Sequence, residues 1–361
     1  MAVRFILGRS GTGKTSLCIR SIADALASVD DAAPLVLLVP EQATYQAERA
    51  ILADERIAGF SRLRVLSFNR LQFHLLGRGA AESEISRAGR QMVVARVLRE
   101  NRDKLKVFAG TDRQQGLAAE LAKTIVELHE YEKTPDDVRE FAERLKTSDP
   151  HDPAADKFAD IAIVYAAYCE FLGRSAEVFI NPDIQLTEAR RKVKDADFLK
   201  GARLWVDGFS SFTIQQQLLL MEVLKVSSEA HIALCLDPAE IDCAKPDAEA
   251  LDEADLFYQT QRTFAELVEA ISKSKLQSDT PIVLAEALRF SSSAALGHIE
   301  KNLFIGAGAE KIDAGKAAHI VNAPNARAEV AYIAREILRL VRHRNFRFRD
   351  IAVVASDIGS Y

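Results

Sequence analysis

The residues best suited to chemistry lie near the start of the chain, in the octapeptide Gly8-Arg9-Ser10-Gly11-Thr12-Gly13-Lys14-Thr15. This octapeptide, called the P-loop below, matches the pattern G-x-x-x-x-G-K-[ST], in which backbone N–H groups and the start of a helix cradle phosphate groups. Lys14 should reach the β and γ oxygens of a nucleotide, and the Thr15 hydroxyl should hold Mg²⁺. The pattern therefore predicts an ATP and Mg²⁺ site formed by the whole octapeptide, with a chance glycine-rich turn as the alternative.

A second candidate is Asp207, which follows the strand-like run Leu204-Trp205-Val206. In P-loop ATPases, an Asp at the end of a later strand serves the Mg²⁺ shell, and a following Glu usually activates water. Asp207 can serve the metal, but Gly208 occupies the place of the base and cannot accept a proton. We therefore expect nucleotide binding with slow hydrolysis and identify no catalytic residue. Alternatively, Asp207 caps the turn at residues 210–211.

Apolar runs rich in Val, Ile and Leu predict the strands that position these residues. They span residues 3–7, 35–39, 64–66, 204–206, 232–236, 319–322 and 351–354. The P-loop follows the first run and precedes a helix whose apolar residues from Cys18 to Val29 recur at spacings of three and four. This alternation predicts an α/β fold with a parallel, doubly wound sheet. From about residue 88 to 200 the pattern is helical, which predicts an inserted helical subdomain.

The composition excludes several classes of protein. The 361 residues are 48% hydrophobic and 27% charged. No run reaches the ~18 to 20 uncharged apolar residues that a bilayer span needs, so we expect a cytoplasmic protein without membrane contact. Four scattered cysteines form no C-x-x-C pair, which argues against a metal cluster or a disulfide framework.

Charge is unevenly distributed along the chain. The net charge is -5, but residues 60–106 hold eleven Lys or Arg against four Asp or Glu, whereas residues 237–269 hold two against ten. A locally basic surface on an acidic protein is typical of a face that binds a polyanion. A helix whose arginines only contact solvent is the alternative, and both interpretations stay open at this point.

Several segments in order resemble the amino-terminal part of the B subunit of the bacterial ATP-dependent helicase/deoxyribonuclease, AddAB. They are the P-loop, Leu38-Val39-Pro40-Glu41-Gln42-Ala43-Thr44-Tyr45-Gln46, Val65-Leu66-Ser67-Phe68-Asn69-Arg70-Leu71 and Val206-Asp207-Gly208-Phe209-Ser210-Ser211-Phe212-Thr213. The similarity continues through residues 288–304 and 327–354, so it spans essentially the whole chain.

This resemblance implies the architecture of superfamily 1 helicases. Residues 1–87 and 200–275 would form a first RecA-like P-loop domain, residues 88–199 a helical insertion, and residues 276–361 the truncated start of a second RecA-like domain. The family's nuclease domain and its iron–sulfur cluster would belong to a carboxy-terminal part that this sequence, ending at Tyr361, does not include.

The resemblance further implies a subunit that acts with an AddA-type helicase/nuclease partner on single-stranded and double-stranded DNA, in double-strand break repair by homologous recombination. Only residues 1–7 precede the P-loop, which leaves no glutamine-bearing segment to read adenine. Residues 234–240 also lack the Gln that would sense the γ-phosphate. These departures imply an ATP-binding but non-motor module that scans single-stranded DNA for the Chi recombination hotspot.

Segments that face DNA in related helicases supply the candidate DNA contacts. The resemblance places them at Gln42, Thr44, Tyr45, Ser67, Phe68, Asn69 and Arg70. A channel for single-stranded DNA needs cations along the backbone and flat side chains on which bases stack. For Tyr45 and Phe68, an aromatic side chain packed in the core at a strand end is an equally good interpretation.

Two functions of other classes stay open. One is a free-standing P-loop kinase or small-molecule ATPase, with the helical insertion as a lid over the substrate. The other is a structural scaffold that keeps only the shape of the P-loop, because the catalytic base is missing. Measuring the binding of single-stranded DNA separates the helicase-like module from both.

Overall fold

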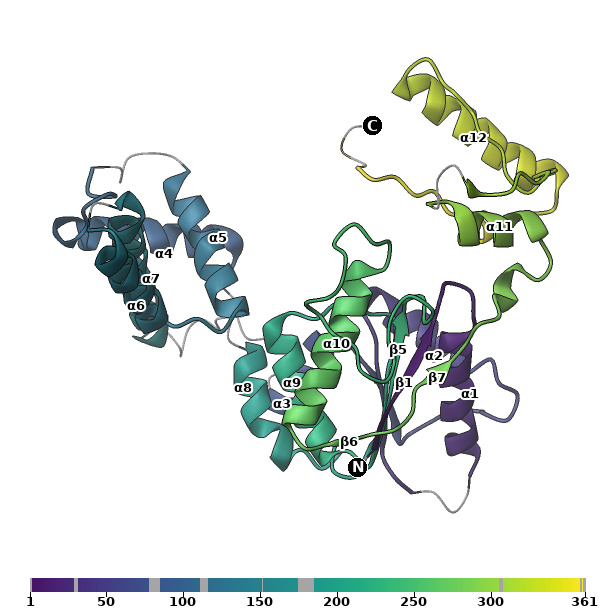
Figure 1. Cartoon of the computed structure of the whole chain (residues 1–361), viewed down its shortest axis with the longest axis horizontal. Helices are drawn as coiled ribbons and strands as arrows, with labels where there is room; N and C mark the ends of the chain where they lie inside the picture. The colour runs from purple at the N-terminus through teal and green to yellow at the C-terminus, as the bar shows by residue number, and fades with distance from the viewer. Residues whose placement is uncertain are drawn as a thin grey trace. The chain divides into compact units, whose positions relative to one another are not determined.

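The fold is described from a computed structural model of the chain (Figure 1). The structure describes residues 2–28, 32–77, 85–110, 116–150, 152–174, 185–304, 308–357 and 359. The chain divides into two compact units, Met1–Arg289 and Phe290–Tyr361, and each is described by itself.

A parallel sheet forms the centre of the first unit. Its strands are β1 (Ala2–Gly8), β2 (Leu35–Leu38), β3 (Leu63–Leu66), β4 (Arg203–Val206), β5 (Glu229–Cys235), β6 (Gln277–Ser278) and β7 (Ile282–Val283). The order across the sheet is β3-β2-β4-β5-β1-β6. The strand β7 also pairs with β1, further along β1 than β6 does. The first five predicted runs each overlap one of these strands, which confirms the α/β class with a parallel sheet, an arrangement consistent with a RecA-like fold.

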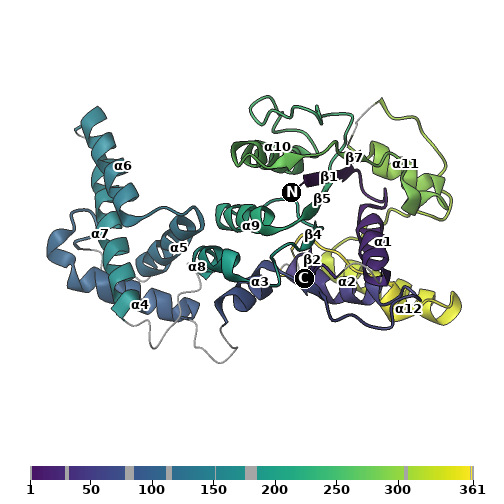
Figure 2. The ribbon, with the colours of Figure 1, turned by 90° about the horizontal axis from the view of Figure 1, so that it is seen from below.

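Helices cover both faces of this sheet (Figures 1 and 2). On one face lie α1 (Lys14–Ala27) and α2 (Thr44–Ile51), and on the other lie α3 (Phe68–Leu76), α8 (Gln185–Lys192), α9 (Ile214–Val226) and α10 (Tyr258–Lys273). In β2, Leu35 and Leu37 enter the core under α1, whereas Val36 and Leu38 enter the core on the opposite face. Alternate residues of a strand point to opposite faces, so a strand buried on both faces must be apolar throughout.

The helices α4 (Arg87–Glu100), α5 (Leu117–Glu130), α6 (Pro135–Ser148) and α7 (Pro153–Arg174) lie between β3 and β4 in the sequence. They pack around an apolar core of their own, with Val94, Ile125 and Tyr165 fully buried. Helix α8 is different, because Ala189 and the following Val193 belong to the core against the sheet. The helical segment with a separate core therefore ends with α7 and not near residue 199.

The sheet also extends further along the chain than the sequence predicts. Residues Ala2 and Val3 of β1 pair with β6, and Ile6 and Leu7 pair with β7. These pairings place residues 277–283 in the first unit, so the boundary falls after Arg289 and not after residue 275. The short β6 and β7 escape a search for long apolar runs because the paired part of each is only two residues long.

The second unit contains α11 (Ala294–Asn302) and α12 (Ala326–His343). The strands predicted at residues 319–322 and 351–354 are wrong, because neither segment has strand structure. A strand exists only where a neighbour completes its hydrogen bonds, and the side chains of Ile320 and Val354 are exposed here. Over the ranges described above, none of the helices has the length and apolar character needed to cross a bilayer.

Candidate nucleotide-binding site

The P-loop connects β1 to α1 at the edge of the sheet where the parallel strands end. Gly11 and Gly13 have φ angles of 79° and 93°, a left-handed conformation that glycine adopts without strain. Gly13 precedes the first residue of α1, and within the described chain no side chain caps this helix. The N–H groups of the first helical turn therefore stay available to an anion next to the loop.

The base of the P-loop is closed by a distant part of the chain. The backbone N–H of Leu284 donates a hydrogen bond to the carbonyl of Leu7 at 2.8 Å, which continues the pairing of β7 with β1. A Cβ atom on Gly8 would lie 2.5 Å from the Leu284 carbonyl oxygen and 2.6 Å from Thr12 Oγ1. Glycine is therefore required at position 8 by packing, before any ligand is considered.

Lys14, the first residue of α1, turns its half-buried ammonium back over the loop. Its Nζ donates hydrogen bonds to the carbonyls of Gly8 and Arg9, at 2.7 and 2.8 Å. Burial lowers the pKa of Lys14, and the neighbouring Cys235 and Asp207 act in the opposite direction. A phosphate would replace neutral carbonyl partners by anionic oxygens, which form shorter and stronger hydrogen bonds with an ammonium.

Asp207 lies directly after β4 and faces Thr15 and Lys14 across the strand ends. Only 7% of Asp207 is exposed, and the Thr15 hydroxyl and the Gly208 N–H lie near enough to its carboxylate to favour the charged form. Burial raises the pKa of Asp207, while the Thr15 hydroxyl, the Gly208 N–H and Lys14 work against the increase. A buried carboxylate beside a hydroxyl supplies the oxygen ligands that Mg²⁺ prefers, so this pair fits the metal that usually accompanies ATP.

Gly208 shows why the position expected to hold a base is a glycine. Its φ angle is 84°, in the left-handed region. A Cβ atom at this position would lie 3.2 Å from Cδ of Pro40, in the loop after β2. Glutamate would be strained here by its backbone conformation as well as by this contact.

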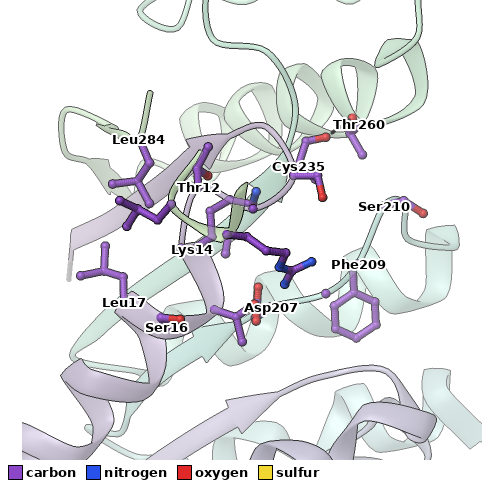
Figure 3. Close-up of a pocket in the computed structure, with 18 of the residues that line it drawn as sticks. Thr12, Lys14, Ser16, Leu17, Asp207, Phe209, Ser210, Cys235, Thr260 and Leu284 are labelled. Atoms are coloured by element: carbon purple, nitrogen blue, oxygen red, sulfur yellow. Dashed lines mark hydrogen bonds between the residues drawn. The ribbon is translucent and has the colours of Figure 1, made fainter. Parts of the chain in front are cut away.

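These residues line a cavity of about 680 Å³ (Figure 3). One wall is the P-loop from Ser10 to Thr15, and another is the segment from Asp207 to Ser210 after β4. Cys235 and Thr260 lie on the side of β5 and α10, where the Thr260 hydroxyl donates a hydrogen bond of 2.7 Å to the Cys235 carbonyl. The cavity is large enough for a nucleotide-sized ligand.

The side chain of Arg9 does not follow the rest of the P-loop. Its guanidinium forms an ion pair with Asp237 at 2.9 Å and lies over the ring of Phe257. The backbone carbonyl of Arg9 accepts hydrogen bonds from Lys14 and from the Thr12 hydroxyl. Arg9 therefore contributes to the shape of the loop rather than to the wall of the cavity.

The predicted DNA contacts separate into buried and exposed side chains. Thr44, Ser67 and Phe68 are each at most 4% exposed, which contradicts direct contact of their side chains with a strand in this conformation. The Thr44 hydroxyl bonds the Glu41 carbonyl, Ser67 caps α3, and Phe68 packs edge-on against two phenylalanines that follow Asp207. For Phe68 the interpretation as a core aromatic is the correct one.

The exposed candidates are Gln42, Tyr45, Asn69 and Arg70. Tyr45 is 69% exposed on α2, which contradicts its interpretation as a core aromatic. Arg70 lies 3.6 Å from carboxylate oxygens of both Glu41 and Glu48. The loops after β2 and β3 therefore meet at the same edge of the sheet as the P-loop. There Arg70, the cation among these candidates, lies beside two carboxylates.

Much of the positive charge predicted between residues 60 and 106 has partners within the protein. The guanidinium of Arg62 donates to backbone carbonyls, and Arg64 lies over the ring of Phe198. Arg96 pairs with Glu100 along α4. These contacts favour the interpretation that much of this stretch serves local structure.

Known proteins are similar in sequence to this chain along its whole length. Residues 5–300 match the model of the family described as "ADDB, N-terminal". The chain belongs to this family. It is 35% identical over 364 aligned residues to the B subunit of the ATP-dependent helicase/deoxyribonuclease of Desulforudis audaxviator, and 36% identical to the proteins of the same name from Symbiobacterium thermophilum and Moorella thermoacetica.

These alignments cover 99 to 100% of the chain but only 30 to 31% of each relative. The chain therefore spans about a third of the length of the curated relatives it matches. The resemblance of this sequence to the AddB family is confirmed over the whole chain.

In this AddB-family chain, the structure adds cavity residues that the motifs do not identify. Cys235 ends β5 and lines the cavity near Lys14, whose pKa it raises. Because β5 neighbours β1, the rule that ligands bind at the carboxyl ends of such strands could have found it. Arg289 also lines the cavity, and its N–H donates to the Gly11 carbonyl at 3.0 Å. No local signal marks Arg289, which lies far from the P-loop in the sequence.

Proposed function

We propose that this chain is the nucleotide-binding, helicase-like module of a B subunit of an ATP-dependent helicase/deoxyribonuclease. The observation that carries the proposal is the cavity in which the P-loop, Lys14, Thr15 and the buried Asp207 meet. The B-subunit name of its relatives supports the same assignment.

In this proposal, ATP binds with its phosphates in the P-loop and Mg²⁺ is held by the oxygens of Thr15 and Asp207. A metal held there would neutralise part of the phosphate charge. Lys14 would leave the carbonyls of Gly8 and Arg9 and turn its ammonium toward the β and γ oxygens. Arg289, at the rim of the cavity, would add a second cation.

The proposed domains follow the packing. A first RecA-like domain consists of the sheet with its covering helices, and the helical insertion consists of α4 to α7 around their own core. The second RecA-like domain begins after Arg289. Among the described residues of 85–174, none lines the cavity, so the helical segment gives no support to a kinase whose insertion closes over the substrate.

The wider role is that of a non-motor module, working with an AddA-type partner on DNA during double-strand break repair and scanning the strand for Chi. The family and the names of the relatives support membership of such a complex. The lack of a base next to Asp207 supports a nucleotide site that does not drive translocation. A scaffold without ligand binding is the competing function, and the nucleotide titration described in the Discussion tests it.

ATP turnover by this chain should be very slow. Because Gly208 cannot accept a proton, we expect less than about 1 s⁻¹ with saturating Mg-ATP, with or without single-stranded DNA. Phosphate release from the purified chain, measured beside equilibrium ATP binding on the same sample, checks this. Turnover at or above that rate would show that another group activates water and would remove the non-motor assignment.

Single-stranded DNA should contact the exposed side chains after β2 and β3. Replacing Tyr45 by alanine should weaken binding about tenfold, since stacking of one base on an aromatic ring contributes roughly 1 to 3 kcal/mol. Replacing Arg70 by glutamine should make the slope of log affinity against log salt concentration shallower by about 0.7. This is the change expected when one phosphate contact is lost. Fluorescence anisotropy with an oligothymidylate at several salt concentrations measures both.

The matched control for Tyr45 is Tyr131, a tyrosine that is 59% exposed at the end of α5. Tyr131→Ala should leave DNA affinity unchanged. Equal losses in the two variants, or no binding by the folded chain at low salt, would contradict this placement of the strand.

A further inference from the structure

The guanidinium of Arg9 is held by two different parts of the first unit. Its Nη1 donates to Asp237 Oδ2 at 2.9 Å, and its guanidinium carbon lies 5.2 Å from the ring centre of Phe257. The side chains of Arg9 and Asp237 are only 19% and 18% exposed. An ion pair that is largely shielded from water is weakened by salt less than a surface pair, and the stacked ring adds to it.

The backbone of Arg9 makes the contacts that define the resting P-loop. Its carbonyl accepts hydrogen bonds from Lys14 Nζ at 2.8 Å and from Thr12 Oγ1 at 2.9 Å. Movement of Arg9 would therefore displace both the ammonium and the turn at Thr12. The guanidinium fixes where this carbonyl lies, because the two groups belong to the same residue.

The anchor on the other side lies just after the sheet. Asp237 comes two residues after the last residue of β5, and the N–H of Leu236 between them donates to the Gly8 carbonyl at 3.2 Å. The second carboxylate oxygen of Asp237 accepts the N–H of Ala239 at 3.0 Å. Phe257 immediately precedes α10. Arg9 is thus tied both to the chain just after β5 and to the residue before α10.

We propose that Arg9 is a positioning residue that holds the P-loop open for phosphate through its contacts with Asp237 and Phe257, and that its guanidinium does not bind phosphate. This inference rests on the proposed nucleotide site. A loop with several glycines loses much conformational entropy when it is ordered. Ordering it before the ligand arrives removes that cost from the binding step and so increases affinity.

A different role for Arg9 predicts the opposite sign. If the guanidinium were a phosphate ligand that Asp237 keeps occupied, then removing the negative charge of Asp237 would release it and tighten nucleotide binding. If the pair positions the loop, then removing the same charge must weaken binding. Asp237→Asn, which keeps the size of the side chain, therefore separates the two roles by direction alone.

The test measures Mg-ATP affinity of the whole chain by calorimetry for Asp237→Asn, Arg9→Met, Arg9→Lys and the double variant Arg9→Met with Asp237→Asn. Each of Asp237→Asn and Arg9→Met should weaken binding about tenfold, the loss expected for one partly buried charged hydrogen bond. The double variant should be no weaker than Arg9→Met alone, because the contact with Asp237 is already lost with the guanidinium. Arg9→Lys, which keeps the charge, should recover most of the affinity.

The matched control is Arg56→Met, which removes an exposed arginine paired with Asp24 and Asp54 and should leave the affinity unchanged. Three results would each overturn the inference: tighter binding by Asp237→Asn, fully additive losses in the double variant, or no rescue by Arg9→Lys. In each case, binding of Mg-ATP by the wild-type chain would still support the nucleotide site. If the wild-type chain binds no Mg-ATP, both fail together. Circular dichroism melting of each variant shows whether the chain is folded. If Arg9→Met unfolds, the direction of the affinity change in Asp237→Asn and the affinity of Arg9→Lys still distinguish the two roles of Arg9.

Discussion

Replacing Lys14 by alanine is expected to weaken Mg-ATP binding by at least about 100-fold, because two charge-assisted hydrogen bonds to phosphate are lost at roughly 1.5 to 3 kcal/mol each. The ammonium lies at the mouth of the P-loop, 2.7 Å from the Gly8 carbonyl, and needs only to turn to meet a phosphate. Calorimetric titration of the purified chain with Mg-ATP measures the change directly.

Lys123→Ala supplies the control for this experiment. Lys123 is an exposed lysine that pairs with Glu120 on α5, so its loss should leave nucleotide affinity unchanged. Folding of both variants is compared by circular dichroism melting. Equal affinity of the Lys14 variant and the wild type would remove the P-loop assignment and leave the scaffold as the better interpretation.

Replacing Gly8 by alanine should disrupt the site by a different route, without removing any group that could contact ATP. The new Cβ would lie 2.5 Å from the Leu284 carbonyl oxygen, which belongs to the backbone beside β7. This backbone cannot retreat without stretching the hydrogen bond from Leu284 N–H to Leu7. We expect the free energy of unfolding to fall by roughly 1 to 3 kcal/mol and ATP affinity to fall with it, as for overpacked cores.

Chemical denaturation and calorimetry on the same sample check both effects of Gly8→Ala. Gly59 provides the matched control, since a Cβ added there meets no atom within 4 Å. Gly59→Ala should therefore change neither stability nor affinity. A Gly8→Ala chain as stable as the wild type would show that the contact between β1 and the segment after β7 is loose.

The Lys14 and Gly8 experiments examine two independent features of the same proposed nucleotide site. Lys14 acts on the ligand through charge, whereas Gly8 acts through the distance between the P-loop and a segment far away in the sequence. The Arg9 variants examine a third part, the anchoring of the loop to β5 and α10. A nucleotide site supported by all three would need the sheet of the first unit together with the chain beyond β7, because its walls come from the ends of β1, β4 and β5 and from that chain.

Local sequence patterns were enough to locate the central strands and the glycine-rich loop that follows β1. The runs that became β2 and β5 are apolar at successive positions, and the run that became β1 is interrupted only by Arg4. Both faces of a parallel sheet are buried, so strands of this kind can be recognised from their composition. The glycines of the P-loop are equally easy to recognise in the sequence, since Gly11 and Gly13 occupy backbone conformations that other residues avoid. These properties depend on a few neighbouring residues, and a pattern of neighbouring residues therefore finds them.

The division of the candidates into those that lie in or beside the site and those that support it came from the three-dimensional packing. Phe68 and Tyr45 are both aromatic residues after a strand, yet Phe68 is buried against Phe209 and Phe212 whereas Tyr45 is exposed. The strands predicted at residues 319–322 and 351–354 failed because a strand requires a partner that no single segment encodes. Burial, pairing and ion pairs such as that of Arg9 with Asp237 depend on segments that are far apart along the chain, and a pattern read along the chain does not contain those distances.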